Sequence, residues 1–333
     1  MFVFEYDHIN YKDLAETLAR ALGVTMHKNR LDFPPQVAEG YLQIIDMQRG
    51  VQAMVFDHVF TDQYRVKRKK ILHEFYTLWF TEIDIKGYVQ VEIDNDRFYV
   101  NNSSFSTALL TSSLFDANYE LSSGTHVRGV NILLDNQWLA YHLGADSKTG
   151  LLQKYLSLKA SRVNMEPLDI EYKKLVQDVF ELVNSSGQFR QIAIQNRIML
   201  LIERFFMRIA LKMETDTLDL KLSREDIQRV MKVEAIITRD VFKPAPFIHE
   251  LARMVNISET KLKNNFKIIF GLPIYQYFQK ARMRAAREAL ETNKYSIKQV
   301  AIEMGYANLS NFSTAFRKEF GLLPSELKEK AFH

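Results

Sequence analysis

The chain has 333 residues, of which 47% are hydrophobic, so it is long enough for two or three domains. It contains no cysteine, which excludes disulfide bonds, thiolate zinc sites, cysteine nucleophiles and iron–sulfur clusters. Residues 221–333 contain 20 Lys and Arg against 12 Asp and Glu, a charge of +8; since the whole chain carries +4, residues 1–220 carry the remaining −4. This asymmetry predicts that the C-terminal part meets a polyanion.

The chain shows no sign of a membrane segment or a secretory signal. Its longest apolar stretches, such as Ile198–Ile202, are far shorter than the roughly 20 residues of a membrane span. The first residues include Glu5, Asp7 and Asp13 instead of a basic stub followed by an apolar block. We therefore expect a cytoplasmic protein with no membrane partner.

The N-terminal part predicts one helix and then many strands. Leu14, Leu18 and Leu22 form a helical stripe over Tyr11–Leu22, which Gly23 ends. Alternation and turn residues then predict a hairpin over 87–101, in which Asn95-Asp96 turns the chain. Further strands are predicted at Tyr41–Met47, Val51–Phe60, Phe75–Ile85, Ser104–Thr111, Tyr119–Ser122 and Val127–Leu134. Such short strands, expected to pair antiparallel, favour a barrel or a sandwich.

After Asp135 the pattern is helical. Helices are predicted at Asp135–Leu143, Lys148–Ser157, Leu168–Asn184 and Gln188–Met213. The last of these carries an apolar stripe broad enough for its neighbouring helix and for a second subunit. We therefore expect a homodimer formed through helices in 168–213, followed by a polar linker over 214–222.

The C-terminal part contains an internal repeat. Ile248, Leu251 and Ala252 recur 49 residues later as Ile297, Val300 and Ala301, whereas Leu262, Phe266, Phe270 and Gly271 recur 50 residues later as Phe312, Phe316, Phe320 and Gly321. The register therefore slips by one residue in the turn between two helices, where neither helix loses its apolar phase. Each copy is predicted to be a helix-turn-helix unit, with Ser258 and Asn308 as N-caps and Gly271 and Gly321 as C-terminal stops.

The second helix of each copy has one apolar and one polar face at about 100° per residue. The polar faces offer Asn, Thr and Ser for base edges, and Lys and Arg for phosphates. In the first copy these residues are Thr260, Lys261, Lys263, Asn264 and Lys267, and in the second they are Ser310, Asn311, Thr314, Arg317 and Lys318.

One continuous helix is predicted between the copies, over Ile274–Thr292, with Arg282, Arg284 and Arg287 along it. At about 1.5 Å per residue it spans roughly 28 Å, so the recognition helices could enter successive major grooves of a duplex. We expect Arg282 to contact phosphate and to strengthen binding to every sequence alike.

These residues resemble the AraC/XylS family of transcription regulators over Val230–Lys330, about a third of the chain. The matching positions are Ala252, Ser258, Leu262, Phe266, Gly271, Pro273, Tyr277, Arg282, Ala286, Leu290, Ile297, Val300, Ala301, Gly305, Tyr306, Phe312, Phe316, Phe320, Gly321, Pro324 and Ser325. Three positions depart from the family pattern: Val255 where glycine is common, Ala289 where leucine is common, and Lys328 where arginine is usual.

The resemblance implies base contacts from Thr260, Lys263, Asn264, Ser310, Asn311 and Thr314. It also implies an α+β chain with a strand-rich, cupin-like effector-sensing domain at 1–165, a helical dimerisation segment and linker at 166–222, and an all-α DNA-binding domain at 223–333. The expected protein is a bacterial transcription activator with double-stranded DNA and RNA polymerase as partners. A small molecule, siderophore-like or otherwise, is the expected effector; a protein partner as the switching signal is the alternative.

The remaining features of the sequence favour structural roles. The basic run Arg65–Lys70 could hold an anionic ligand, but a solvated loop or strand edge is favoured. The aromatic residues Tyr76, Trp79, Phe80 and Trp138 fit an ordinary core better than an effector cavity, so no effector-binding residues are assigned. The histidines lack the spacing of metal ligands, and no set of catalytic residues can be assembled. We therefore expect no metal, no cofactor and no enzymatic activity.

Overall fold

The computed structural model describes the chain except for residues 8–9, 72, 74, 94–95, 102–103, 144–164, 215–223, 271, 293 and 331–333. The chain divides into two compact units, Met1–Lys221 and Leu222–His333. Most of the predicted linker at 214–222 and the whole predicted helix Lys148–Ser157 lie outside the described residues. The division of the chain into three functional segments stays a prediction.

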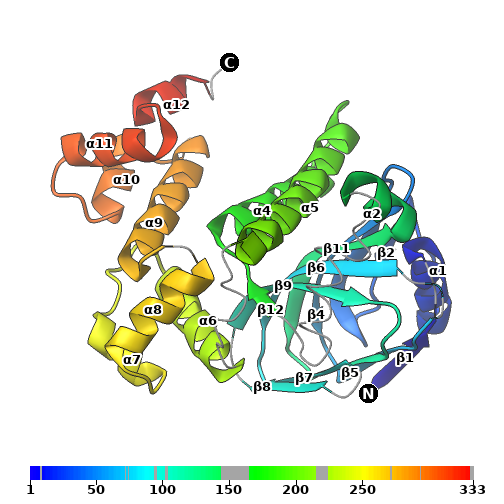
Figure 1. The fold of residues 1–333 in the computed structure, drawn as a ribbon. Coiled ribbons are helices and arrows are strands. Elements are labelled where there is room, and N and C mark those ends of the chain that lie inside the picture. Colours follow the sequence, from blue (N-terminus) through cyan, green and yellow to red (C-terminus); the bar gives the residue numbers. More distant parts are fainter. Residues whose placement is uncertain are drawn as a thin grey trace. The chain divides into compact units, whose positions relative to one another are not determined.

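The N-terminal unit is built on two sheets (Figure 1). The five-stranded sheet has the order β1-β5-β10-β7-β8 and the seven-stranded sheet the order β12-β9-β6-β11-β4-β3-β2. The strands are β1 (Phe2–Tyr6), β2 (Arg30–Asp32), β3 (Ala38–Ile45), β4 (Val51–Phe60), β5 (Tyr64–Arg68), β6 (Phe75–Asp84), β7 (Tyr88–Ile93), β8 (Asp96–Asn101), β9 (Ser104–Ser112), β10 (Ala117–Leu121), β11 (His126–Asp135) and β12 (Met165–Pro167).

The structure confirms the predicted strands to within three residues at their ends, and β7 and β8 pair as the predicted hairpin. It adds β1, β2, β5 and β12. Strand β12 pairs with β9, so the prediction that the chain is helical throughout after Asp135 was wrong. The prediction of antiparallel pairing alone was also wrong, because β1 runs parallel to β5, with Phe2 opposite Tyr64.

The seven-stranded sheet has two differently used faces. Because side chains alternate along a strand, Val51, Ala53 and Val55 of β4 point to one face and Met54 and Phe56 to the other. The first face packs against α4 (Ile170–Val183) and α5 (Arg190–Glu214) in one hydrophobic core (Figure 1). The second face lines a cavity.

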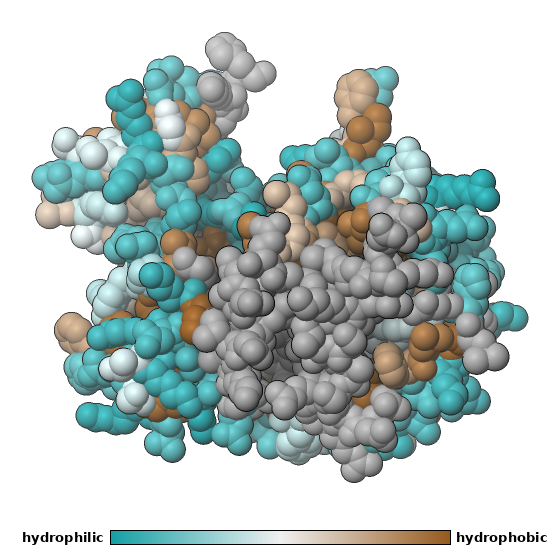
Figure 2. All heavy atoms as spheres, viewed as in Figure 1, coloured by the Kyte–Doolittle hydropathy of each residue, from teal (hydrophilic) through white to brown (hydrophobic). Residues whose placement is uncertain are grey.

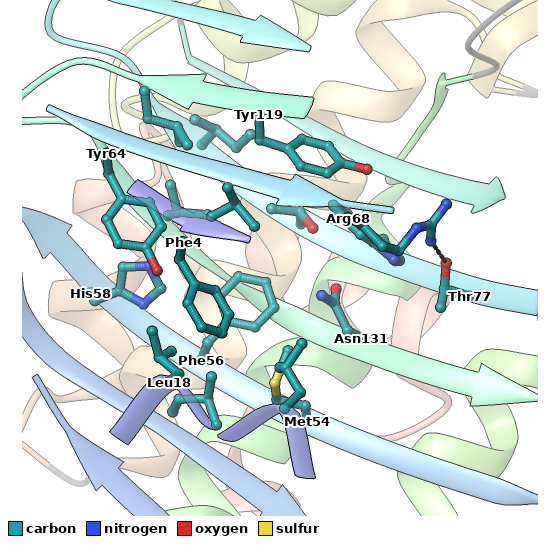
Figure 3. Close-up of a pocket in the computed structure, with 18 of the residues that line it drawn as sticks. Phe4, Leu18, Met54, Phe56, His58, Tyr64, Arg68, Thr77, Tyr119 and Asn131 are labelled. Atoms are coloured by element: carbon teal, nitrogen blue, oxygen red, sulfur yellow. Dashed lines mark hydrogen bonds between the residues drawn. The ribbon is translucent and has the colours of Figure 1, made fainter. Parts of the chain in front are cut away.

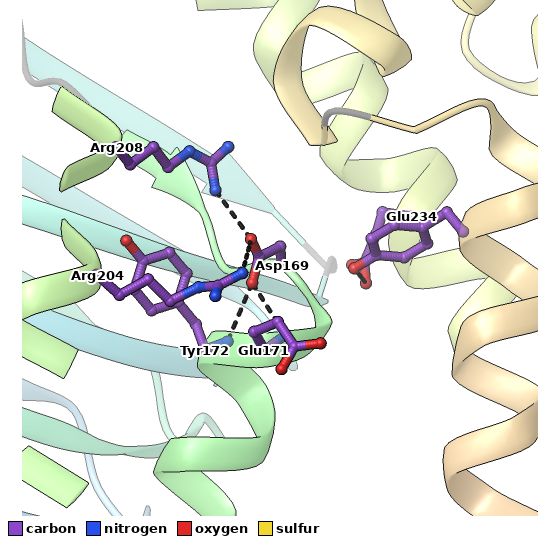
Figure 4. A network of polar contacts seen from close by, with 7 residues as sticks. Asp169, Glu171, Tyr172, Arg204, Arg208 and Glu234 are labelled. Carbon is purple, nitrogen blue, oxygen red and sulfur yellow. Dashed lines mark hydrogen bonds and ion pairs between the residues drawn. The ribbon is translucent and has the colours of Figure 1, made fainter. Parts of the chain in front are cut away.

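Asp169 fastens α4 to α5 (Figure 4). Its Oδ1 accepts hydrogen bonds from the backbone N–H groups of Glu171 and Tyr172, at 2.9 and 3.0 Å, and so caps α4. Its Oδ2 lies 3.1 Å from Nη2 of Arg204 and 3.2 Å from Nη1 of Arg208, both on α5. One carboxylate therefore joins the two helices over the sheet.

Two further helices lie in the described residues of the N-terminal unit. The structure confirms α1 at Tyr11–Leu22, capped by the Asn10 side chain and ended by Gly23 at a φ of 68°. It packs near β1, β3 and β4, and its buried Leu14 and Leu18 line the cavity. The predicted helix after Asp135 is α2 (Asn136–Leu143).

The C-terminal unit is helical in its described residues. Its helices are α6 (Arg224–Thr238), α7 (Ile248–Met254), α8 (Glu259–Phe270), α9 (Ile274–Glu291), α10 (Ile297–Glu303), α11 (Leu309–Phe320) and α12 (Pro324–Lys330). The predicted linking helix is α9, which ends one residue earlier than expected. Sequence reasoning missed α6 and α12.

Candidate functional site

The first helix-turn-helix unit is α7, a turn and α8. The turn passes through Asn256, whose φ of 54° lies in the left-handed region that asparagine tolerates better than most residues. Ser258 Oγ then accepts a hydrogen bond from the Lys261 N–H at 3.3 Å, which confirms Ser258 as the N-cap of α8. The predicted C-terminal stop, Gly271, lies outside the described residues.

The second unit repeats this geometry in α10 and α11. Gly305 takes the left-handed place with a φ of 71°, Asn308 caps α11 through its side chain, and Gly321 ends α11 with a φ of 73°. Gly305 lies 49 residues after Asn256, whereas the N-caps lie 50 residues apart. The one-residue slip therefore falls in the turn, as the repeat predicted.

The structure corrects the interpretation of Val255. Val255 is buried and lies 49 residues before the equally buried Met304, so it occupies a core position. The residue that takes the place of the turn glycine is Asn256, as shown by its positive φ. The departure from the family pattern is thus an asparagine in a left-handed turn, which costs less than valine would there.

The two recognition helices bury aromatic faces. Phe266 of α8 is fully buried and packs against Phe270 and Tyr277, with ring centroids 4.6 and 5.5 Å away. Phe316 of α11 packs against Phe312 at 5.7 Å and Phe320 at 4.7 Å. The phenylalanines at 266, 312 and 316 are therefore core residues that hold the helices in place and do not face a ligand.

The polar faces of α8 and α11 point to solvent. On the side shown in Figure 2, hydrophilic residues, in teal, cover most of the C-terminal domain. Of the eleven predicted DNA-binding residues, ten are exposed: Thr260, Lys261, Lys263, Asn264, Lys267, Ser310, Asn311, Thr314, Arg317 and Lys318. The structure thus places them on one face of each recognition helix, although their contact with DNA stays a prediction.

Arg282, the eleventh, is half-buried on α9. Its guanidinium lies over the Phe278 ring at 5.5 Å, and a Cβ added at Gly305 would meet its Nη2 at 3.4 Å. Burial lowers the pKa of Arg282, although the nearby Tyr306 acts in the opposite direction. Arg282 therefore packs beside the second turn and is less exposed than the other ten predicted residues.

Two lysines of the first reading face already have carboxylate partners. Lys261 Nζ lies 2.9 Å from Oδ1 of the buried Asp226, on α6. Lys263 Nζ lies 3.6 Å from Glu259 Oε2, one helical turn away and exposed to solvent. The ion pair of Lys261 thus joins α8 to α6, whereas the exposed ion pair of Lys263 contributes little stability.

The N-terminal unit contains a cavity of about 200 Å³ between its sheets (Figure 3). Its walls come from both sheets and from α1, and most of its lining is apolar. Its polar lining residues include His58, Arg68, Thr77, Tyr119 and Asn131. Sequence reasoning assigned none of them, because no local spacing connects residues from five different strands.

The aromatic residues considered for an effector cavity divide between two environments. Trp79 lines the cavity, with the Tyr119 ring 4.9 Å away. Tyr76, Phe80 and Trp138 lie in the core with α4 and α5, as an ordinary structural role predicts. The described residues contain no group of three or more His, Asp or Glu side chains that could hold a metal ion.

Burial in the cavity wall lowers the pKa of His58 to about 4, against the raising effect of Asp57, so His58 is neutral at pH 7. Between pH 6.5 and 4 the unfolded chain therefore binds a proton that the folded chain does not, and stability falls as the pH falls. From pH 7 to pH 5 we expect a loss of about 2 kcal/mol.

Urea unfolding of the N-terminal unit at both pH values measures this loss. In His58→Gln the pH-dependent loss should shrink by about that amount. His27→Gln, at an exposed histidine of the same unit, should keep the loss of the parent chain. An equal loss in all three chains would show that His58 titrates alike in both states.

Residues 251–330 match a family model described as a helix-turn-helix domain. The match begins in α7 and ends with α12, so it covers both units of the repeat. It lies wholly within the C-terminal unit, and it agrees with the repeat, the turns and the caps described above.

The chain is similar to two named regulators. It is 31% identical over 90 residues to the HTH-type transcriptional activator RhaS of Escherichia fergusonii. The matched region covers 27% of this chain and 32% of that protein. It is 21% identical over 251 residues to the TCP pilus virulence regulatory protein of Vibrio cholerae. This matched region covers 73% of this chain and 81% of that protein.

Among solved structures, the chain is similar to ToxT from Vibrio cholerae, with 17% identity, a TM-score of 0.29, and coverage of 85% of this chain and 98% of that one. The chain spans only 8% to 33% of the lengths of the six curated relatives that match first. In the described part of the chain, every helix is too short or too polar to cross a bilayer.

Proposed function

On the premise that residues 222–333 form an AraC-type helix-turn-helix domain, we propose that the whole chain is a sequence-specific DNA-binding regulator of transcription. The observation that carries this proposal is the division of α8 and α11, each of which buries aromatic residues and exposes amides, hydroxyls and cations. Exposed groups of this kind on a helix after a tight turn can address the major groove. Such a protein works where the DNA is, in the cytoplasm.

Bases are read by side chains at the N-terminal and central parts of α8 and α11. We assign this role to Thr260, Lys263, Asn264, Ser310, Asn311 and Thr314. The Asn264 amide makes no hydrogen bond within the described residues, so it is available for a bidentate contact with adenine. Lys267, Arg317 and Lys318 are assigned to phosphates, with smaller contributions from Lys261, because Asp226 neutralises it, and from the half-buried Arg282.

Alanine at Asn264 or Thr314 is expected to change which sequence the protein prefers. Each lost base contact should reduce discrimination at one base pair by about 1–3 kcal/mol. Selection of binding sites from a random DNA pool measures the preference. Gln279→Ala removes an exposed amide from α9 and should leave the preference unchanged. Unaltered preferences in both reading-face variants would show that these faces do not read DNA.

Two exposed lysines should differ in how they affect the salt dependence of DNA binding. Lys318→Ala removes a phosphate contact, so the slope of log K against log salt should become less steep by about 0.9. Lys261→Ala removes a charge that Asp226 already neutralises, so the slope should change less. Fluorescence anisotropy at several salt concentrations measures both slopes, and equal changes would contradict the proposed division of roles.

The regulator is proposed to act as a homodimer through α5. This helix buries Ile194, Ile198 and Phe205 against its own sheet and α4. Its outer side nevertheless exposes large apolar side chains at intervals of eight, seven and four residues: Ile192, Leu200, Met207 and Leu211. Hydrophobic residues, in brown, are visible on this helical part in Figure 2. Such a stripe on a helix of 25 residues suits self-pairing with a second copy.

A small-molecule effector in the N-terminal unit is the proposed signal, and activation with RNA polymerase is the proposed outcome. The cavity supports a small molecule over a protein partner, because it offers a concave, mainly apolar site. The cupin-like description of this unit stays a prediction. In vitro transcription from a selected binding site, with and without a bound effector, tests the sign of the regulation.

A further inference from the structure

The cavity of the N-terminal unit contains a buried positive charge. Arg68, at the end of β5, is 3% exposed and lies in the cavity wall (Figure 3). The outward-facing Lys67 beside it is half-exposed, so the basic run does not share one environment. The interpretation of the whole run as a solvated loop or strand edge was therefore wrong for Arg68, which lies on a strand paired on both sides by β1 and β10.

The partners of Arg68 are neutral. Its Nη1 donates to Thr77 Oγ1 at 3.3 Å, and its Nη2 donates to the carbonyl oxygens of Ser112 at 2.9 Å and Phe115 at 3.3 Å. The hydrogen bond to Thr111 Oγ1 is long, at 3.5 Å. Among the described residues no carboxylate pairs with this guanidinium, and its Nε–H has no acceptor. A buried cation without a counter-ion is costly, so an anion that enters the cavity would be strongly favoured.

Further hydrogen-bond donors around the same cavity lack acceptors. The Tyr11 and Tyr119 hydroxyls and the Trp79 Nε1–H are buried and unpaired within the described chain. Burial raises the pKa of both tyrosines even though the Arg68 charge lowers it, so both hydroxyls stay protonated and can donate. The rest of the lining is aliphatic and aromatic, with Phe4, Phe56 and Leu18 among it (Figure 3).

We propose that this cavity binds an apolar monocarboxylate, with its carboxylate on Arg68 and its hydrocarbon part against the apolar lining. One guanidinium balances one negative charge, whereas a phosphate would bring a second charge into an apolar site. A cavity of about 150 Å³ holds benzene, so about 200 Å³ suits an acid with on the order of ten non-hydrogen atoms, aryl or alkyl. This inference deepens the proposed effector function and rests on it only for its regulatory consequence.

The comparison of acids with their amides tests the proposal without any variant. Isothermal titration calorimetry of the full chain with 3-phenylpropanoate and octanoate, and with the two corresponding amides, separates charge recognition from hydrophobic burial. We expect at least one acid to bind between about tenfold and about hundredfold more tightly than its amide. Preference for the phenyl or the octyl chain distinguishes the aryl from the alkyl source.

A matched pair of variants on one strand locates the charge. Arg68→Met should abolish the preference for the acid over the amide, whereas Lys67→Met, one residue away and facing outward, should keep it. Circular dichroism and binding of the amide report whether Arg68→Met has folded. Equal binding of acid and amide by the unaltered chain, failure of both acids to bind, or an unchanged preference in a folded Arg68→Met would overturn the proposal.

DNA binding distinguishes this failure from failure of the proposed function. A chain that selects a DNA sequence but ignores both acids would remain a regulator, with another kind of signal. If the chain binds an acid but selects no DNA sequence, the proposed carboxylate site would stand and the proposed regulatory function would be excluded.

Discussion

Replacing Phe316 with alanine is expected to destabilise the C-terminal unit by about 3–5 kcal/mol and to abolish DNA binding at 37 °C. The Phe316 ring is fully buried and contacts Phe312 and Phe320 on the same helix. Its core also includes Met283 and Leu290 of α9, which close the cluster from the other side. A cavity at this point would loosen α11 from α9, and the loss is a large part of the total stability of a small domain.

Urea unfolding followed by circular dichroism measures the stability, and an electrophoretic shift assay measures DNA binding. Thr314→Ala is the matched control, because it lies two residues earlier on the same helix and is exposed. It should change stability by less than about 0.5 kcal/mol while altering sequence preference. If Phe316→Ala left stability intact, the inner face of α11 would not be the core that the structure shows.

The C-terminal helices could be predicted closely because their signals are local. Apolar residues at helical spacing, the caps Ser258 and Asn308, and the stop at Gly321 fix α8 and α11 within the sequence that forms them. The residue with the left-handed backbone in the first turn was harder to predict. The register slips inside the turn, so no periodic pattern aligns the two copies there. Only its φ identifies Asn256, instead of Val255, as the equivalent of Gly305.

The cavity could not be predicted because its parts come together through non-local pairing. Strand β5 lies between β1 and β10, with Tyr64 opposite Phe2 in one partner and Leu121 in the other. No local sequence pattern predicts the parallel pairing of β1, at the start of the chain, with β5, which begins at Tyr64. Arginine is, moreover, rarely buried, so a basic run favours a solvent-exposed interpretation. The burial of Arg68 is therefore a property of the assembled sheets.

The apolar stripe of α5 was anticipated only in outline. Ile198 and Phe205 of α5 are buried in the core that this helix forms with its own sheet and α4. The side chains left for a second subunit differ from them, and Ile192 and Met207 are the most informative because 65% and 58% of their surfaces are exposed. Exposure of large apolar residues along one helix is costly in a monomer, which is why we propose this side of α5 as the dimer interface.

Glutamate at both Ile192 and Met207 is therefore expected to convert the proposed dimer into monomers. A twofold pairing would bring four new carboxylates into one apolar interface, so the dissociation constant should rise by at least about a hundredfold. Each subunit should stay folded, since both positions are exposed in the single chain. Sedimentation equilibrium over a range of concentrations measures the association.

Leu114→Glu provides the control, because Leu114 is an exposed leucine of the same unit that is not part of α5, and it should leave the association unchanged. The DNA affinity of the monomeric variant should fall for sites with two half-sites but remain for a single one, since α8 and α11 stand in one chain. A parent chain that is already monomeric, or a double variant that still dimerises, would exclude the α5 stripe as the dimer interface. Retained affinity for paired half-sites in a monomer would show that each chain binds its half-site independently.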